Sequence, residues 1–257
     1  MDLFENRISD LEVYLTRMQR SVLDKLFFID KVFEPFENII DFGCANGEVI
    51  RVLRTMCPEY NYIGYDISEE MIRSAEKNVP EAFFCSRWED IPVPFEKSLL
   101  NISSTIHEVY SYGTAADIEE FIGRVFSSGF RYITVRDMMF SDSDDRPADG
   151  SALKTLRESV FADKLKDFEG FRGEITTQKQ LVHFLLKYRY TQNWEREVRE
   201  DYFPISVESF MKLIPESYTV TYFDHFTLPY TAWQIRRDLG IDLTDRTHIK
   251  LILERKI

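Results

Sequence analysis

The run Asp41-Phe-Gly-Cys-Ala-Asn-Gly47 decides how this sequence is interpreted. It follows the apolar residues Ile39 and Ile40 and precedes an apolar pattern from Val49 to Leu53. A short apolar run, a glycine-containing turn and an amphipathic pattern, in that order, predict a strand that ends in a tight turn and opens a helix. Small side chains at such a turn let the main chain lie against a bound ligand. We therefore predict a ligand-binding turn here.

The spacing of the glycines in this run differs from that of a dinucleotide-binding loop. Gly43 is followed by Ala45 and Gly47, whereas a dinucleotide-binding loop has the pattern G-x-G-x-x-G with a third glycine in register. Asp41 precedes the turn, and Asp66 ends the next apolar run, 19 residues after Gly47. Each feature alone also fits an ordinary strand-to-helix turn or an acid at a helix start. Together they predict a β-α-β unit whose ligand lies at the carboxyl ends of the strands.

The order of these features resembles the class I, Rossmann-like, S-adenosylmethionine-dependent methyltransferases, over about residues 36 to 139. The resemblance implies that the glycine loop passes under the methionine part of the cofactor. It also implies that Asp66 accepts hydrogen bonds from the ribose hydroxyls. The positions that it assigns to the cofactor S-adenosyl-L-methionine are Asp41, Gly43, Cys44, Ala45, Gly47, Asp66, Ile67, Met71, Arg87, Trp88 and Ser103.

The sequence departs from this family after the third predicted strand. There the family usually has an acidic residue and then a small one beside the adenine, and this chain has Arg87 and Trp88. Glu89 and Asp90 are the available substitutes for the acid, and the Trp88 ring offers an aromatic face to the base. The alternative is that Trp88 packs under the loop, since tryptophan is largely buried in most proteins.

His107 and Glu108 begin a helix after the fourth predicted strand and are the catalytic candidates. In the family the reactive methyl group emerges here, and a His-Glu pair resembles many methyltransferases that act on small molecules. The protein mainly aligns nucleophile and methyl group, so a base is needed only when the acceptor must lose a proton. The pKa of a histidine suits that task, but His107 also fits a structural role at a helix start. No metal site is predicted, because Ser111 stands where an HExxH motif needs its second histidine.

Regular alternation of strands and helices predicts an α/β fold with a mostly parallel, seven-stranded, Rossmann-like sheet and helices on both faces. We divide the chain into an N-terminal helical segment (1–35), a cofactor-binding core (36–140), a mostly helical insertion or lid after the fifth strand (141–203) and the C-terminal part of the core sheet (204–257).

The N-terminal segment carries an amphipathic stripe from Ile8 to Leu26, which predicts one or two helices. In many methyltransferases of this class such a helix lies over the cofactor. The resemblance therefore implies that Arg17 or Arg20 reaches the cofactor carboxylate.

Two aromatic patterns bear on the acceptor. Cations and aromatic residues interleave from Lys187 to Arg196, which fits either a solvated helix face or a recognition surface. Aromatic residues that could build an acceptor pocket are Tyr110, Tyr112, Tyr188, Tyr190, Trp194 and Tyr230.

Composition limits the class of protein. The chain has 257 residues, 44% of them hydrophobic, which is enough for a full core. It has no run of membrane-spanning length and no signal-peptide pattern, so we expect a cytoplasmic protein. Its three cysteines lack disulfide or zinc spacing. A net charge of −12 argues against sequence-independent binding to nucleic acid, although a local basic patch remains compatible with it.

The leading prediction is a methyltransferase that acts on an oxygen or nitrogen nucleophile of a small molecule. The alternatives are a methyltransferase acting on RNA or a modified nucleoside, and a non-catalytic partner protein that keeps the fold and the cofactor. A nicotinamide dehydrogenase is disfavoured by the missing glycine. The oligomeric state does not follow from the sequence.

Overall fold

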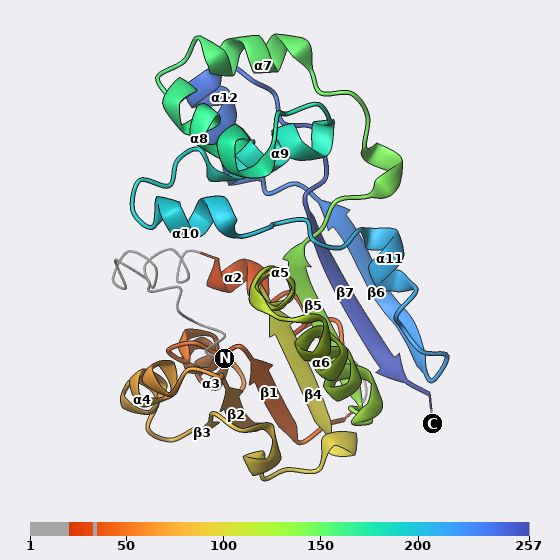
Figure 1. The fold of residues 1–257 in the computed structure, drawn as a ribbon. Coiled ribbons are helices and arrows are strands. Elements are labelled where there is room, and N and C mark those ends of the chain that lie inside the picture. Colours follow the sequence, from red (N-terminus) through yellow and green to blue (C-terminus); the bar gives the residue numbers. More distant parts are fainter. Residues whose placement is uncertain (1–20, 33–34, 257) are drawn as a thin grey trace.

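Alternating strands and helices build the parallel part of a seven-stranded sheet (Figure 1). The structure is a computed structural model and describes residues 21–32 and 35–256. The strand order is β3-β2-β1-β4-β5-β7-β6, with β7 antiparallel to both neighbours and the other pairs parallel. The predicted Rossmann-like sheet is confirmed. The strands span Asn38–Phe42 (β1), Asn61–Tyr65 (β2), Phe83–Cys85 (β3), Ser98–Ser103 (β4), Tyr132–Met138 (β5), Tyr218–Phe226 (β6) and His248–Arg255 (β7).

The helices fall into three groups. Those on the sheet faces are α3 (Glu48–Met56), α4 (Glu69–Asn78), α5 (Ile106–Tyr112), α6 (Ala115–Ser127) and α11 (Val207–Met211). A helical layer above the carboxyl ends of the parallel strands contains α7 (Gly150–Arg157), α8 (Ala162–Arg172), α9 (Gln178–Lys187), α10 (Trp194–Arg199) and α12 (Pro229–Leu239). The short α2 (Val22–Lys25) lies between this layer and the sheet.

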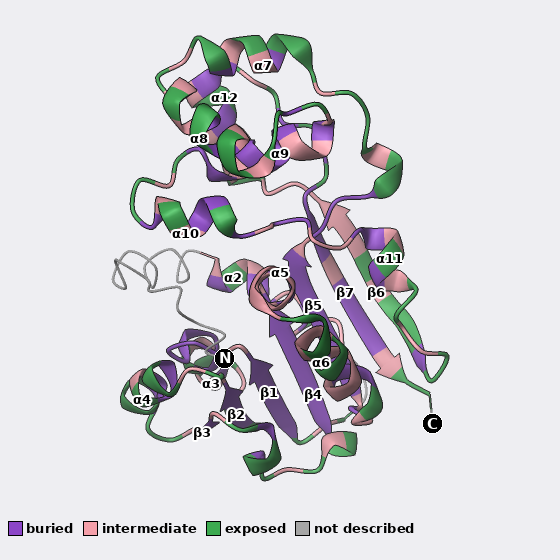
Figure 2. Ribbon diagram, viewed as in Figure 1, coloured by how far each residue is buried: buried purple, intermediate pink, exposed green. Residues whose placement is uncertain are grey.

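The central strands are buried along their length (Figure 2), and their alternating side chains supply two cores, one on each face of the sheet. Ile40 and Leu100 belong to the apolar cluster under α5, α6 and α11. Their neighbours Ile39 and Leu99 belong to the cluster under α2, α3 and α4. Every residue of β1 and β4 is buried, as expected for central strands of a parallel sheet covered on both sides.

The helical layer has an apolar core of its own, separate from the cores of the sheet. Leu156 of α7, Phe168 of α8 and Phe184 of α9 pack in one cluster with Ile235 of α12. The 141–203 segment is therefore joined by a helix from between β6 and β7, which the sequence did not predict. The division of the chain into domains stays a prediction.

The first part of this layer contains two consecutive helices. α7 and α8 are separated by a turn. There the Ser159 hydroxyl accepts a hydrogen bond from the N–H of Phe161 at 3.1 Å. A serine hydroxyl that bonds to nearby main-chain groups in this way competes with a continuous helical ladder.

α2 is attached to the sheet by ion pairs. Asp24 accepts hydrogen bonds from Arg136 Nε of β5 at 2.7 Å and pairs with Lys250 Nζ of β7 at 2.5 Å. The rest of the predicted N-terminal stripe before Ser21, including Arg17 and Arg20, lies outside the described residues.

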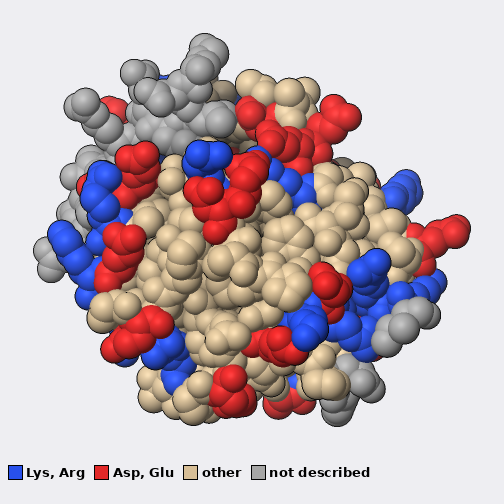
Figure 3. All heavy atoms as spheres, turned by 90° about the horizontal axis from the view of Figure 1, so that it is seen from below, with Lys and Arg blue, Asp and Glu red and all other residues tan. Residues whose placement is uncertain are grey.

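The surface mixes charges of both signs. Seen from below, acidic and basic side chains are interspersed around an uncharged centre (Figure 3). No helix in the described ranges is both long and apolar enough to cross a membrane. All three cysteines are free thiols.

We expect Gly43→Ala to destabilise the fold by about 1–3 kcal/mol, the usual cost of a strained backbone conformation. Gly43 has a φ of 74°, and an added Cβ would lie 2.5 Å from the Thr105 hydroxyl oxygen. The control is Gly170→Ala in α8, where nothing lies within 4 Å of an added Cβ. That change should be neutral or stabilising by up to about 1 kcal/mol. Chemical unfolding measures both, and equal stability of the two variants would contradict the expectation.

Candidate active site

Main-chain hydrogen bonds fix the glycine loop to the end of β2. The N–H groups of Gly43 and Cys44 both donate to the carbonyl oxygen of Tyr65, at 2.8 and 3.0 Å. Gly43, Ala45 and Gly47 have φ angles of 74°, 45° and 75°, and Gly47 is the residue before α3. The predicted strand, tight turn and helix are therefore confirmed.

Asp66 links this loop to α4. Its Oδ2 accepts from the N–H of Ala45 and its Oδ1 from the N–H of Ser68, both at 2.9 Å. Burial raises the pKa of Asp66, and these two hydrogen bonds oppose the rise. A carboxylate has about four acceptor positions, so Asp66 retains acceptors for hydroxyl donors. Nearby, Met71 is buried in α4, whereas Ile67 is exposed.

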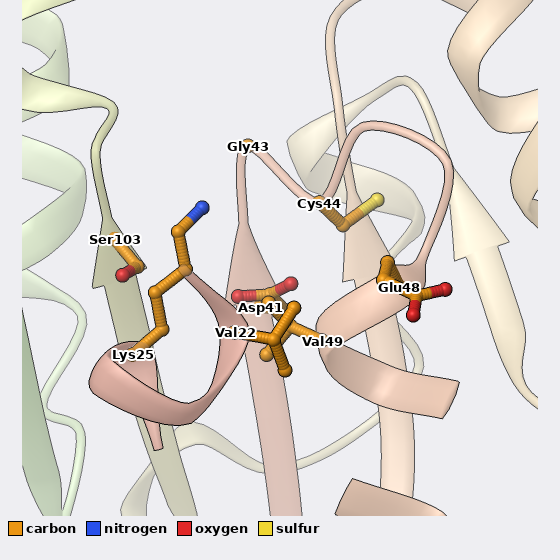
Figure 4. Close-up of a pocket in the computed structure, with 8 residues that line it drawn as sticks. All are labelled: Val22, Lys25, Asp41, Gly43, Cys44, Glu48, Val49 and Ser103. Carbon is orange, nitrogen blue, oxygen red and sulfur yellow. The ribbon is translucent and has the colours of Figure 1, made fainter. Parts of the chain in front are cut away.

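A small pocket lies where α2 meets the carboxyl ends of β1 and β4 (Figure 4). Predicted cofactor residues line it together with residues of α2 and α3. The lining residues are Val22, Lys25, Asp41, Gly43, Cys44, Glu48, Val49 and Ser103.

The polar groups of this pocket suit a ligand with both donors and acceptors. Asp41 accepts a hydrogen bond from Asn101 Nδ2 at 2.7 Å, and burial raises its pKa to about 6. The hydroxyl of Ser103 is buried and has no hydrogen-bond partner among the described residues. A buried polar atom without a partner is uncommon. These residues therefore fit the amino and carboxylate groups of S-adenosylmethionine, with Asp66 beside them for the ribose.

Arg87 and Trp88, predicted beside the adenine, differ in burial. The Trp88 ring is buried, with its centroid 5.9 Å from that of Phe42 and 5.5 Å from that of Tyr65. Arg87 is exposed, and its Nε lies 3.8 Å from an Asp90 oxygen. This packing corresponds to the alternative in which Trp88 lies under the loop. Contact of either residue with adenine stays a prediction.

His107 lies at the carboxyl ends of β4 and β5, held between two carboxylates. Its Nδ1 is 2.5 Å from Asp137 Oδ1, and its Nε2 is 2.8 Å from Glu200 Oε1. Burial disfavours the charged ring, but Asp137 and Glu200 outweigh burial and raise the pKa of His107 to about 10. The ring is therefore an imidazolium at neutral pH, and both of its nitrogens are engaged.

This arrangement favours the structural alternative for His107, and its role as a base stays a prediction. A protonated imidazole has no lone pair with which to take a proton from an acceptor. His107 instead connects β5 to the loop after α10, through Asp137 and Glu200. Such a contact positions the surrounding groups, which corresponds to the structural alternative for this residue.

Two residues from the end of α10 complete the charged cluster. Arg196 Nη1 lies 3.0 Å from Glu200 Oε2, and Arg196 Nη2 lies 3.0 Å from Glu108 Oε1. The Tyr112 hydroxyl donates to Glu200 Oε2 at 3.2 Å. Burial raises the pKa of Glu108, the nearby Glu200 adds to the rise, and Arg196 opposes it. Glu108 is half-buried and thus remains available at the edge of the cluster.

The ligand atoms of His107, Glu108 and Glu200 lie within 4.8 Å of one another, a spacing that would suit a metal ion. The Arg196 guanidinium already pairs with both carboxylates. Arg196 thus supplies the positive charge that balances Glu108 and Glu200.

The predicted aromatic residues do not form one pocket. Tyr112 joins the charged cluster, Tyr188 is buried in the helical layer, and Tyr230 is exposed on α12, stacked on Trp233. Lys187, predicted on a solvated or recognition face, is fully buried, with its ammonium over the Tyr202 ring.

Comparison with known proteins agrees with this geometry. Residues 39–127 match a family model described as a methyltransferase domain. The plantazolicin methyltransferase BpumL, solved with SAH, superposes with a TM-score of 0.53 at 12% identity, over 95% of this chain and 86% of that one. The plantazolicin methyltransferase BamL gives 0.51 at 15% identity, over 97% and 95%. A SAM-dependent methyltransferase from Anabaena variabilis gives 0.50 at 13% identity, over 93% and 85%. No curated protein matches the sequence.

The fold and the match to residues 39–127 define a class I methyltransferase domain. Residues 39–127 thus match a methyltransferase domain, and the chain shares its fold with S-adenosylmethionine-dependent methyltransferases of known structure. Sequence reasoning missed Lys25, Asn101, Arg196 and Glu200 as members of the site. The pair Arg196 and Glu200 has the i,i+4 spacing of a helical ion pair, but that spacing does not indicate which part of the sheet the pair meets.

Proposed function

We propose that this enzyme methylates an oxygen or nitrogen nucleophile of a small molecule bound between α5 and the helical layer. The observation that carries the proposal is the contact of Glu200 and Arg196 with His107 and Glu108, 2.8 to 3.0 Å across the two layers. Charged groups from the helical layer thereby reach the strand edge that holds the cofactor residues. An acceptor held there would lie beside the pocket of Asp41 and Ser103.

In this proposal S-adenosylmethionine supplies the electrophilic methyl group, and the chain binds and aligns it. Asp66 accepts hydrogen bonds from the ribose hydroxyls, and the loop from Gly43 to Gly47 carries the methionine part. Alignment of two reactants accounts for a large share of catalysis in such displacements. Glu108 accepts a proton from the acceptor or orients it, and His107 is a positioning residue that holds Glu200.

Several observations favour a small acceptor. The helical layer lies above the carboxyl ends of the parallel strands, where a lid over a small acceptor would be placed (Figure 1). The overall charge of −12 opposes attraction to a phosphate backbone. In addition, the related BpumL was crystallised with a triazolic desmethylPZN analog.

The test is transfer of a labelled methyl group from S-adenosylmethionine to a metabolite extract and, separately, to total RNA. We expect label in the small-molecule fraction. Label in RNA alone would reject the acceptor class, and failure to bind S-adenosylhomocysteine in a titration would reject the cofactor site.

Glu108→Gln is expected to lower kcat with the identified acceptor about 100-fold, a typical effect of losing a proton acceptor. The amide keeps the shape of the side chain and one acceptor oxygen, so cofactor affinity should change less than about threefold. The control is Glu69→Gln, an exposed acid of α4 paired only loosely with Arg73 at 3.4 Å, which should retain full activity. An unchanged kcat in Glu108→Gln would remove Glu108 from the reaction.

A further inference from the structure

Lys25 places an ammonium group inside the pocket. Only 4% of the residue is exposed, and its side chain rises from α2 between Ser103 and Gly43, above Asp41 (Figure 4). Lysine is rarely buried to this extent unless an opposite charge pairs with it. We therefore expect a negatively charged group to pair with the Lys25 ammonium.

Within residues 21–32 and 35–256, no hydrogen bond or ion pair joins the Lys25 ammonium to a protein group. Burial and the nearby Arg136 together lower the pKa of Lys25 to about 8, although the charges of Asp41, Asp137 and Glu108 oppose the change. An ammonium without a hydrogen-bond partner in a buried site is costly. The Ser103 hydroxyl in the same pocket also lacks a partner in the part of the chain that the structure describes. Two unsatisfied polar groups that line one pocket indicate a polar ligand group.

The backbone of α2 holds Lys25 in this place. Asp24, the preceding residue, is bound by Arg136 at 2.7 Å and Lys250 at 2.5 Å. These two cations neutralise Asp24, which is therefore not the partner of Lys25. The same ion pairs fix the short helix across the ends of β5 and β7, so that Lys25 is directed at β1 and β4.

We propose that Lys25 binds the carboxylate of the methionine part of the cofactor. This inference rests on the proposed cofactor site. S-Adenosylmethionine and S-adenosylhomocysteine each carry one carboxylate, which is the anionic group that a buried ammonium requires, and a hydrogen bond between two charged groups is among the stronger ones. The N-terminal segment then contributes directly to cofactor binding through α2.

The test compares two ligands and two variants by isothermal titration calorimetry. The ligands are S-adenosylhomocysteine and its decarboxylated analogue, the aminopropyl thioether that lacks only the carboxylate. Lys25→Met keeps the length of the side chain and removes the charge. We expect it to weaken S-adenosylhomocysteine about 10- to 100-fold and the decarboxylated analogue less than about threefold. Lys31→Met, a change at a lysine that pairs with the exposed Asp30, should alter neither affinity.

Two results for Lys25→Met would overturn the inference. The first is an unchanged or improved affinity for S-adenosylhomocysteine. The second is an equal loss of affinity for both ligands, because that loss would indicate a structural role. If Lys25→Met does not fold, the wild-type protein still decides the matter, because it should bind S-adenosylhomocysteine at least about tenfold more tightly than the decarboxylated analogue. Failure of the wild-type protein to bind either ligand would instead contradict the proposed cofactor site.

Discussion

Asp66→Ala is expected to bind S-adenosylhomocysteine at least about 100-fold more weakly than the wild-type protein. A hydrogen bond to a charged group contributes about 1.5–3 kcal/mol, so two ribose hydroxyls that lose their acceptor account for a factor of this size. The substitution also removes the acceptor of the Ala45 N–H, at 2.9 Å, and loosens the loop that carries the methionine part. Calorimetric titration gives the affinity directly.

Two controls separate ribose binding from damage to the loop. Asp66→Asn keeps an acceptor oxygen for one main-chain N–H and should lose less affinity than Asp66→Ala. Glu76→Ala removes an exposed acid of the neighbouring helix α4 and should bind normally. If Asp66→Ala binds S-adenosylhomocysteine as tightly as the wild-type protein, the assignment of the ribose to Asp66 is wrong.

The largest loss of stability is expected for Asp137→Ala, about 3–5 kcal/mol, as for breaking a buried ion pair. Asp137 is fully buried. Its oxygens accept from the N–H groups of Thr105 at 2.9 Å, Ile106 at 2.7 Å and Met138 at 2.7 Å, besides the contact with His107. The alanine variant leaves these donors and a charged ring unsatisfied. For a chain of this size the midpoint of thermal unfolding should fall by about 10 °C.

The pH dependence distinguishes loss of the ion pair from simple loss of packing. His107 has a folded-state pKa of about 10 against an ordinary value of 6.5. Its contribution to stability is therefore complete below pH 6.5 and is lost as pH rises toward 10. The pKa of Asp137 is lowered, so the contribution of Asp137 is present above its ordinary value of 3.8 and is lost at lower pH. We expect the stability of Asp137→Ala to fall less steeply between pH 6.5 and 9 than that of the wild-type protein, and equal slopes would refute the coupling.

The strand ends were predictable because they are encoded locally. Glycine, acid and apolar residues at Asp41 to Gly47 and at Asp66 specify a turn with few alternatives, and α3 contains the apolar pattern from Val49 to Leu53. Ser103 and His107 follow in register because β4 lies beside β1. A regular parallel sheet converts sequence order into spatial order.

Residues that reach the site across the fold were not predictable in this way. Glu200 lies 93 positions after His107 in the sequence, and only the packing of the helical layer brings them to 2.8 Å. Asp137 and Glu200 together raise the pKa of His107, so its role could not be predicted from its position alone. Likewise, an amphipathic pattern identifies the buried face of α2 but not that Lys25 enters a pocket.

The path of the chain through the helical layer limits how that layer can move and which truncated variants can fold. The chain leaves the sheet after β5, returns at α11, leaves again after β6 and returns at β7. Ile235 and Leu239 of α12 share one apolar cluster with Leu156 and Phe184 from the first excursion. With both excursions anchored at each end, any movement of the layer displaces four crossings at once, which favours small sliding motions over a single swinging hinge. A shortened enzyme must omit both excursions together, because either one alone would present its apolar surface to water.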